Sequence, residues 1–198
     1  MPAGAQAVEA YLAKLPQGLA SHPECKIKWS AVQRSLDLCP PGGERGLPSE
    51  LVEFISRPHR PNEWVPEVYM HVWLVYAATQ WCATEEALMD HFIESNRKLF
   101  EHFAYRVMFR LVGPRKIISQ AAARWRNFHQ GTTLEPIEIR PREAVLHHVV
   151  PANHCPEPIA HAYAGAIIAG VELAGAREVE VETRAQSPTL NVFTCRWR

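Results

Sequence analysis

The sequence lacks an excess of charge of either sign. Its 198 residues include 21 lysines and arginines and 21 aspartates and glutamates, so the formal net charge at pH 7 is zero. A protein that holds nucleic acid or an anionic membrane surface by charge usually carries a basic face. We therefore expect neither nucleic acid nor a membrane among its partners.

Long hydrophobic runs and paired cysteines are also missing. The most apolar stretch, residues 162–176, contains Glu172 and is shorter than the roughly 20 residues that span a bilayer. Residues 1–20 have no basic segment followed by an apolar one, so they do not resemble a secretory signal. The five cysteines are odd in number and form no CxxC pair, which is typical of reduced thiols. These absences predict a cytoplasmic protein.

Short motifs that mark known chemistries are absent as well. The sequence contains no glycine-rich phosphate loop, no HExxH, no GxSxG and no paired catalytic carboxylates. We therefore expect no catalytic residue and no cofactor.

The composition that remains is typical of a globular protein. Hydrophobic residues make up 47% and charged residues 21% of a chain long enough for one core. Periodicity and capping residues predict a helical N-terminal half. The predicted helices run over 5–14, from Ser30 to Pro40, over 51–55, onward from Pro66, from Thr84 to Gly113, and from Arg115 to His129.

After Gly131 the hydrophobic period changes from that of a helix to that of a strand. Residues 134–140 and 143–150 predict two strands, 156–175 a helix rich in small residues, and 177–184 and 189–197 two more strands. The order β-β-α-β-β behind a helical half predicts an α+β fold with an antiparallel sheet. We expect residues 1–60 to form a helical extension packed on the core, and 61–198 an α+β domain of the ligand-binding kind.

The stretch "FIESNRKLFEHFAYRVMFRLVGPRKIISQAAARWRNFHQGTTLE" resembles a large paralogous family of myxobacterial proteins of unknown function. In that family a long helix ends in a Gly-Pro-Arg turn before a basic-aromatic helix. The distal half is similar too, with Gly165, Gly170 and Gly175 spaced along the helix and Trp197 closing the last strand. The resemblance covers roughly residues 85–198 and consists of structural motifs.

More distantly, the helices-then-sheet order and the final "VFTCRW" are similar to vinyl-reductase-type and haem-nitric-oxide-type sensor domains. Such domains bind small ligands and report to a partner. Vinyl-reductase-type members often carry cysteines near the C-terminal strands, and this chain has Cys195 there. The resemblance implies a sensor-like, regulatory module that acts through ligand binding or protein–protein interaction.

The aromatic residues of the helix after Pro66 are the first candidate site. Tyr69, Trp73 and Tyr76 recur at i, i+4 and i+7 and so share one helical face. A cavity could form where small side chains of the later helix lie beneath these rings, and amphipathic rings suit such a wall. The predicted ligand-binding residues are Tyr69, Trp73, Tyr76, Trp125, Ala164 and Gly165. Ordinary core packing is the alternative.

The second candidate is the stretch "HHVVPANHCPEPIAH", residues 147–161, which holds four of the ten histidines. His147 and His148 are adjacent, so on a strand they point to opposite faces. A metal site would use His148, His154, Cys155 and His161. Their spacing matches no tight zinc motif. We therefore expect a strand, a loop and a helix start without a metal.

Three hypotheses about function follow. The first is a non-catalytic regulatory or sensory module that binds a small apolar molecule or a protein partner, which predicts an apolar cavity beside Trp73. The second is a small metal- or histidine-dependent enzyme centred on residues 147–161, which predicts histidines converging on a cleft. The third is an assembly subunit, which predicts an exposed apolar patch. The sequence leaves the oligomeric state open, a homodimer included.

Overall fold

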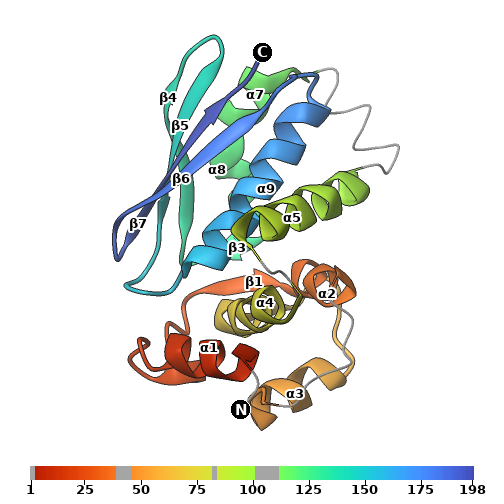
Figure 1. Cartoon of the computed structure of the whole chain (residues 1–198), viewed down its shortest axis with the longest axis vertical. Helices are drawn as coiled ribbons and strands as arrows, with labels where there is room; N and C mark the ends of the chain where they lie inside the picture. Colours follow the sequence, from red (N-terminus) through yellow and green to blue (C-terminus); the bar gives the residue numbers. More distant parts are fainter. Residues whose placement is uncertain (1–2, 39–45, 82–83, 101–111) are drawn as a thin grey trace.

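The computed structural model describes residues 3–38, 46–81, 84–100 and 112–198. It has the predicted α+β class, with helices in the N-terminal half and an antiparallel sheet at the C-terminal end. Figure 1 shows the two parts, a helical part below and a sheet covered by helices above. In the described residues, no helix combines the length and the apolar character needed to cross a membrane.

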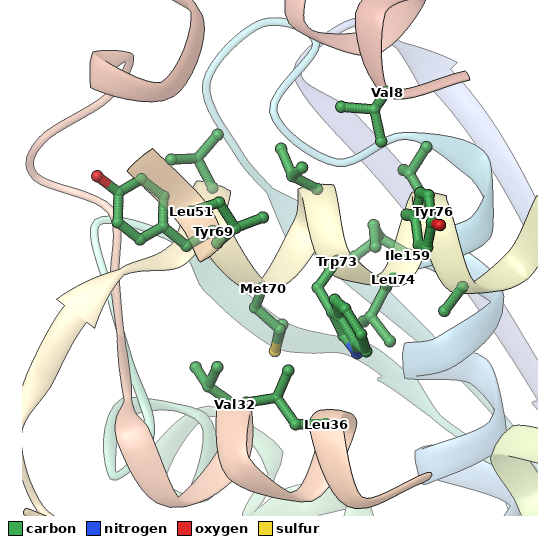
Figure 2. Packing of buried hydrophobic residues seen from close by; sticks show 14 of the residues in the cluster. Val8, Val32, Leu36, Leu51, Tyr69, Met70, Trp73, Leu74, Tyr76 and Ile159 are labelled. Carbon is green, nitrogen blue, oxygen red and sulfur yellow. The ribbon is translucent and has the colours of Figure 1, made fainter. Parts of the chain in front are cut away.

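The helical part is built around α4 (Glu67–Trp81). This helix is packed by α1 (Ala3–Leu12), α2 (Trp29–Leu38) and α3 (Ser49–Ser56), and a 3₁₀ turn, η1, covers Gly18–Ala20. Residues 67–78 are all buried, because α4 carries apolar side chains on every side rather than on one stripe. In Figure 2, Met70 and Trp73 of α4 point toward Val32 and Leu36 of α2.

A small sheet, which the sequence analysis did not predict, lies at the start of α4. It consists of β1 (Lys26–Lys28), β2 (Trp64–Pro66) and β3 (His129–Gln130), antiparallel in the order β2-β1-β3. The predicted helix from Arg115 to His129 is therefore wrong at its end. The chain instead forms α7 (Pro114–Ser119) and α8 (Ala121–Arg126), and His129 lies on a strand beside Ile27.

The larger sheet confirms the predicted β-β-α-β-β order. Strands β4 (Thr133–Ile139), β5 (Glu143–Val149), β6 (Glu180–Ser187) and β7 (Leu190–Arg196) pair antiparallel in the order β4-β5-β7-β6. Helix α9 (Glu157–Leu173) packs on this sheet. Burial alternates along β5, so His148 faces the core and His147 the other side. On the last strand Phe193 and Cys195 are buried, as is Trp197 just beyond it.

Helix α5 (Glu85–Phe100) packs against α9. A Cβ atom at Gly165 would lie 2.9 Å from the Cβ of Phe92, so only glycine allows the two helices to approach this closely. The sequence predicts that the helix of α5 continues to Gly113. Residues 101–111 lie outside the described part of the chain.

Two large hydrophobic clusters and a smaller one form the core of the described residues. One large cluster joins α1–α4, and the other joins the larger sheet, α8 and α9. The described residues of α1, α2 and α3 share their cluster with α4, and the division into 1–60 and 61–198 stays a prediction. Cys155 and Tyr163 pack against both clusters. The junction between the clusters is therefore the place where polar side chains could affect both parts at once.

Candidate functional site

A fully enclosed glutamate lies at this junction. Glu67 is the first residue of α4, where an acidic side chain suits the positive end of the helix dipole. Its backbone N–H donates to the carbonyl of Cys25 at 3.0 Å, which fixes the start of α4 to the small sheet. The residue is only 1% exposed. Its carboxylate therefore depends on protein groups in place of water.

Three donors from distant segments surround the carboxylate. His129 on β3 approaches Oε1 through Nδ1 at 2.6 Å, and the Tyr163 hydroxyl on α9 donates to the same oxygen at 3.1 Å. His154, in the turn before α9, approaches Oε2 through Nε2 at 3.0 Å. Both oxygens are thus occupied, and α4, β3, the turn and α9 are joined through one side chain.

A second layer fixes the turn that holds His154. The carbonyl of His154 accepts from His71 Nδ1 at 2.9 Å and from the Tyr11 hydroxyl at 2.7 Å. Since a carbonyl only accepts, Nδ1 of His71 carries a proton. Its other ring nitrogen, Nε2, lies 3.2 Å from the Tyr163 hydroxyl. His71 thus connects the turn to α9 one helical turn after Glu67.

Aromatic rings close the site on the side of the larger sheet. Trp125 stacks on His129 with ring centroids 3.7 Å apart, and its Nε1 donates to Thr132 at 3.0 Å. His148 meets Trp125 and Tyr163 edge-on, at 4.9 Å and 5.2 Å. The buried Nδ1 atoms of His148 and His154 have no hydrogen-bond partner among the described residues. Two lone pairs or N–H groups are therefore left without a partner.

Burial and the neighbouring rings decide the charges. Burial alone would raise the pKa of Glu67, but His129, then His154 and His71, hold it well below the usual value. Burial lowers the pKa of His71 and of His148 to about 3 in each case. Burial, with Glu67 next, raises the pKa of Tyr163 well above its usual value. Near pH 7 an ionised carboxylate therefore lies beside neutral His71, His148 and Tyr163.

Three of the enclosed groups could share a metal ion. The ligand atoms of Cys25, Glu67 and His154 all lie within 4.8 Å of one another. Cys25 precedes β1 and is 1% exposed, and its Sγ lies 3.7 Å from the carbonyl of Gly131. Thiolate, carboxylate and imidazole together are ligands that suit zinc and similar transition metals.

The predicted ligand-binding residues divide between the two clusters. Tyr69 donates to Glu50 at 2.5 Å, Trp73 Nε1 donates to the carbonyl of Ser35 at 3.1 Å, and Tyr76 packs against α1. All three lie in the helical cluster. Trp125 and Ala164 belong to the other cluster, while Gly165 lies against α5. Of these six, Trp125 is part of the Glu67 site; binding of an apolar ligand by the set stays a prediction.

The alternative metal set is only partly assembled. His148 and His154 reach the Glu67 site, whereas Cys155 is half-buried with its Sγ 4.0 Å from the carbonyl of Pro156. His161 is a partly exposed residue of α9. The site instead contains four residues that are not among those predicted from the sequence, namely Cys25, Glu67, His71 and His129. One signal was available, since Glu67 and His71 stand four residues apart in an otherwise apolar helix.

One hollow lined by described residues lies away from the Glu67 site. It measures about 150 Å³ and is formed by side chains of β6 and β7, namely Glu182, Arg184, Gln186, Val192 and Thr194. Its lining is mainly polar and belongs to the face of the sheet opposite to the buried Phe193. This hollow is therefore separate from both the Trp73 side of α4 and the Glu67 site.

Comparison with known proteins identifies the fold. No protein-family model and no curated protein matches the chain. Among solved structures, a single-substitution variant of Tt H-NOX has a TM-score of 0.55 at 10% identity, covering 87% of this chain and 95% of that one. The Fe(II) unliganded H-NOX protein from K. algicida has a TM-score of 0.53 at 11% identity, covering 87% and 97%.

An oxygen-binding H-NOX domain related to soluble guanylate cyclases, solved as its oxygen complex, has a TM-score of 0.52 at 10% identity, with 86% and 92% covered. At such low identity these likenesses show a shared fold. They support the resemblance to haem-nitric-oxide-type sensor domains as a resemblance of architecture.

Proposed function

We propose that this chain is a sensory module that binds a small ligand at the Glu67 site and converts occupancy into a change in packing between its two parts. The fold supports this proposal, because the similar structures include a domain described as binding oxygen.

The observation that carries the proposal is the position of the Glu67 carboxylate. It is hydrogen-bonded to the helical part's own β3 strand through His129 and to α9 and its preceding turn through Tyr163 and His154. A ligand that changes the charge or the hydrogen bonds of this carboxylate must alter contacts in both parts. Such a two-sided contact is what a ligand-driven change of conformation requires.

Haem, which the similarity to H-NOX structures suggests as a ligand, does not fit between the rings of the Glu67 site. The rings around the site lie against one another with centroids 3.7 Å to 5.3 Å apart, so no flat slot remains between them. Nδ1 of His71, Nδ1 of His129 and Nε2 of His154 already have hydrogen-bonding partners. A smaller and more polar ligand suits this site better.

The enzyme hypothesis gains one feature and lacks another. Four histidines do converge, but only His148 and His154 come from residues 147–161, and the exposed fractions are 1% for His71, 8% for His129, 2% for His148 and 0% for His154. Within the described residues they line no open cleft, which a substrate would need. Convergence without access favours an enclosed ligand and a regulatory role.

Hydrogen–deuterium exchange tests the proposed coupling. Glu67→Gln keeps the shape of the side chain but replaces one accepting oxygen by a donating NH₂ group, so one of the three hydrogen bonds is lost. We expect faster amide exchange both in β1 and β3 and at the start of α9. Glu63→Gln is the matched control, because its side chain is 39% exposed. Faster exchange confined to the first turn of α4 would contradict the proposal.

The apolar-ligand version of the hypothesis has its own test. If the Glu67 site is the ligand site, titration of the wild type with hydrophobic ligands should give no saturable change in tryptophan fluorescence that depends on Trp73. The comparison is with the Trp73→Ala variant. A saturable response lost only in Trp73→Ala would move the binding site to the helical cluster.

A further inference from the structure

The ligand class follows from the charge that surrounds Glu67. An ionised carboxylate that is 1% exposed needs a compensating positive charge, because burying an unpaired charge costs several kcal/mol. In the described part of the chain, every ion pair of Glu67 is with a histidine, and none is with a lysine or an arginine. The enclosed carboxylate therefore has histidines, and no permanently charged side chain, as its ion-pair partners among the described residues.

The donors nearest to this charge form a transition-metal ligand set. Cys25 comes from the residue before β1, Glu67 from the first turn of α4, and His154 from the turn before α9, and their ligand atoms lie within 4.8 Å of one another. Their exposed fractions are 1%, 1% and 0%. A sulfur and a nitrogen ligand exclude Mg²⁺ and Ca²⁺, which take oxygen ligands, and favour Zn²⁺ and its neighbours.

Two buried histidine nitrogens in or next to this ligand set are unpartnered. Nδ1 of His154 is buried and has no hydrogen-bond partner among the described residues, and the same holds for Nε2 of His22. The two rings meet edge-on with centroids 5.3 Å apart. His22 and Cys25 are the ends of one turn, in which the N–H of Cys25 donates to the carbonyl of His22 at 2.8 Å. The imidazole of His22 and the thiol of Cys25 thus lie three residues apart in one turn.

The remaining neighbours hold the ligands in place. Oε1 of Glu67 accepts from His129 and Tyr163, and Oε2 lies 3.0 Å from Nε2 of His154, one of the proposed ligands. Gly131 has a φ of +76°, and a Cβ there would lie 2.6 Å from the carbonyl oxygen of Glu24, so β3 lies directly against the residues that carry Cys25. Such outer contacts orient ligands in metal sites.

We propose that Cys25, Glu67 and His154 bind one divalent transition-metal ion of the zinc type. This inference rests on the proposed function and names its ligand. It replaces the expectation from sequence that the chain holds no metal, and it uses only His154 of the set His148, His154, Cys155 and His161. Binding replaces the proton of the Cys25 thiol by the metal ion and releases that proton to solvent, while the neutral imidazole of His154 coordinates through the ring nitrogen that carries no proton.

Titration of the full chain with Zn²⁺ after removal of bound metal by a chelator tests the proposal. We expect one Zn²⁺ per chain by calorimetry, and an affinity at least about 100-fold lower for Cys25→Ser, since loss of outer contacts alone costs 10–100-fold. Cys155→Ser is the matched control and should bind Zn²⁺ as the wild type does. Absence of Zn²⁺ binding by the wild type, or equal binding by Cys25→Ser, would overturn the proposal.

Co²⁺ gives a second readout that needs no variant. Co²⁺ bound by the wild type should show the near-ultraviolet absorption of a cobalt–thiolate bond, and Zn²⁺ should displace it. A spectrum without that absorption would remove Cys25 from the site even if Cys25→Ser does not fold.

The two proposals can fail separately. If the wild type binds no Zn²⁺ while Glu67→Gln still speeds exchange in both parts, the metal proposal is wrong and the coupling stands. If Zn²⁺ binds but leaves exchange at β3 and α9 unchanged, the ion is structural and the sensory function is wrong.

Discussion

Replacing His148 with phenylalanine should remove a defined part of the protein's sensitivity to acid. His148 is 2% exposed, and it lies edge-on to Trp125 and Tyr163 with its Nδ1 unpartnered among the described residues. Phenylalanine keeps a ring of similar shape in this position and removes the group that takes up a proton.

The size of the effect follows from the two pKa values. Burial lowers the pKa of His148 to about 3 in the folded chain, against about 6.5 in the unfolded chain. Between these values only the unfolded chain binds the proton, so the folded state loses stability as the pH falls below 6.5 and continues to do so down to about pH 3. One group contributes about 1.4 kcal/mol per pH unit, and the range from about pH 6.5 to pH 5 covers about one and a half units. The stability lost between pH 7 and pH 5 is therefore about 2 kcal/mol.

Urea unfolding of the chelator-treated protein at pH 7 and pH 5 measures this contribution. The stability lost by the wild type on going to pH 5 should exceed that lost by His148→Phe by about 2 kcal/mol. His147→Gln is the control, because its side chain lies on the opposite face of β5. If the wild type and His148→Phe lose the same stability between the two pH values, His148 is not held neutral by burial and the reasoning fails.

Two further predictions concern packing and the backbone. Trp197 is 7% exposed in the cluster of the larger sheet, so Trp197→Ala should lower the free energy of unfolding by about 3–5 kcal/mol, and an unchanged melting temperature would contradict this. Gly131 and Gly175 both have positive φ, but a Cβ meets the backbone only at Gly131. Each Gly→Ala change should cost about 1–3 kcal/mol in urea unfolding, with an additional loss for Gly131→Ala; equal losses would show that β3 moves away freely.

The sequence predicts the larger elements of this fold because their periodicity is strong. Alternating apolar residues in 177–184 and 189–197 correctly predict β6 and β7, and the small-residue helix between two pairs of strands is α9. The alternation also places Phe193 and Cys195 on the buried face. Long elements of this kind bury enough of one face for their pattern to show in a single chain.

The candidate site could not be predicted in the same way, because the elements that assemble it are short. Strands β1 and β2 have three residues each and β3 has two, which is too short for alternation to appear. The sequence therefore predicts a helix at His129 and no regular element at Cys25. Glu67 was visible as an acid ahead of an apolar helix, but the rule that acids suit helix starts accounted for it without a partner. Its donors follow 62, 87 and 96 residues later, and no local pattern records such distances.

Those separations also set the order in which the site can come into being. During synthesis α1 to α4 can fold on one another as soon as residue 81 has emerged, because they share one cluster. Glu67 then begins a helix with none of its three donors yet made, and its carboxylate must remain hydrated until β3 and finally α9 arrive. Closing loops of this length against an already hydrated charge is slow compared with helix formation. The carboxylate of Glu67 can therefore have all three donors only once Tyr163 is in place, and a chain that stops before Tyr163 lacks one of them.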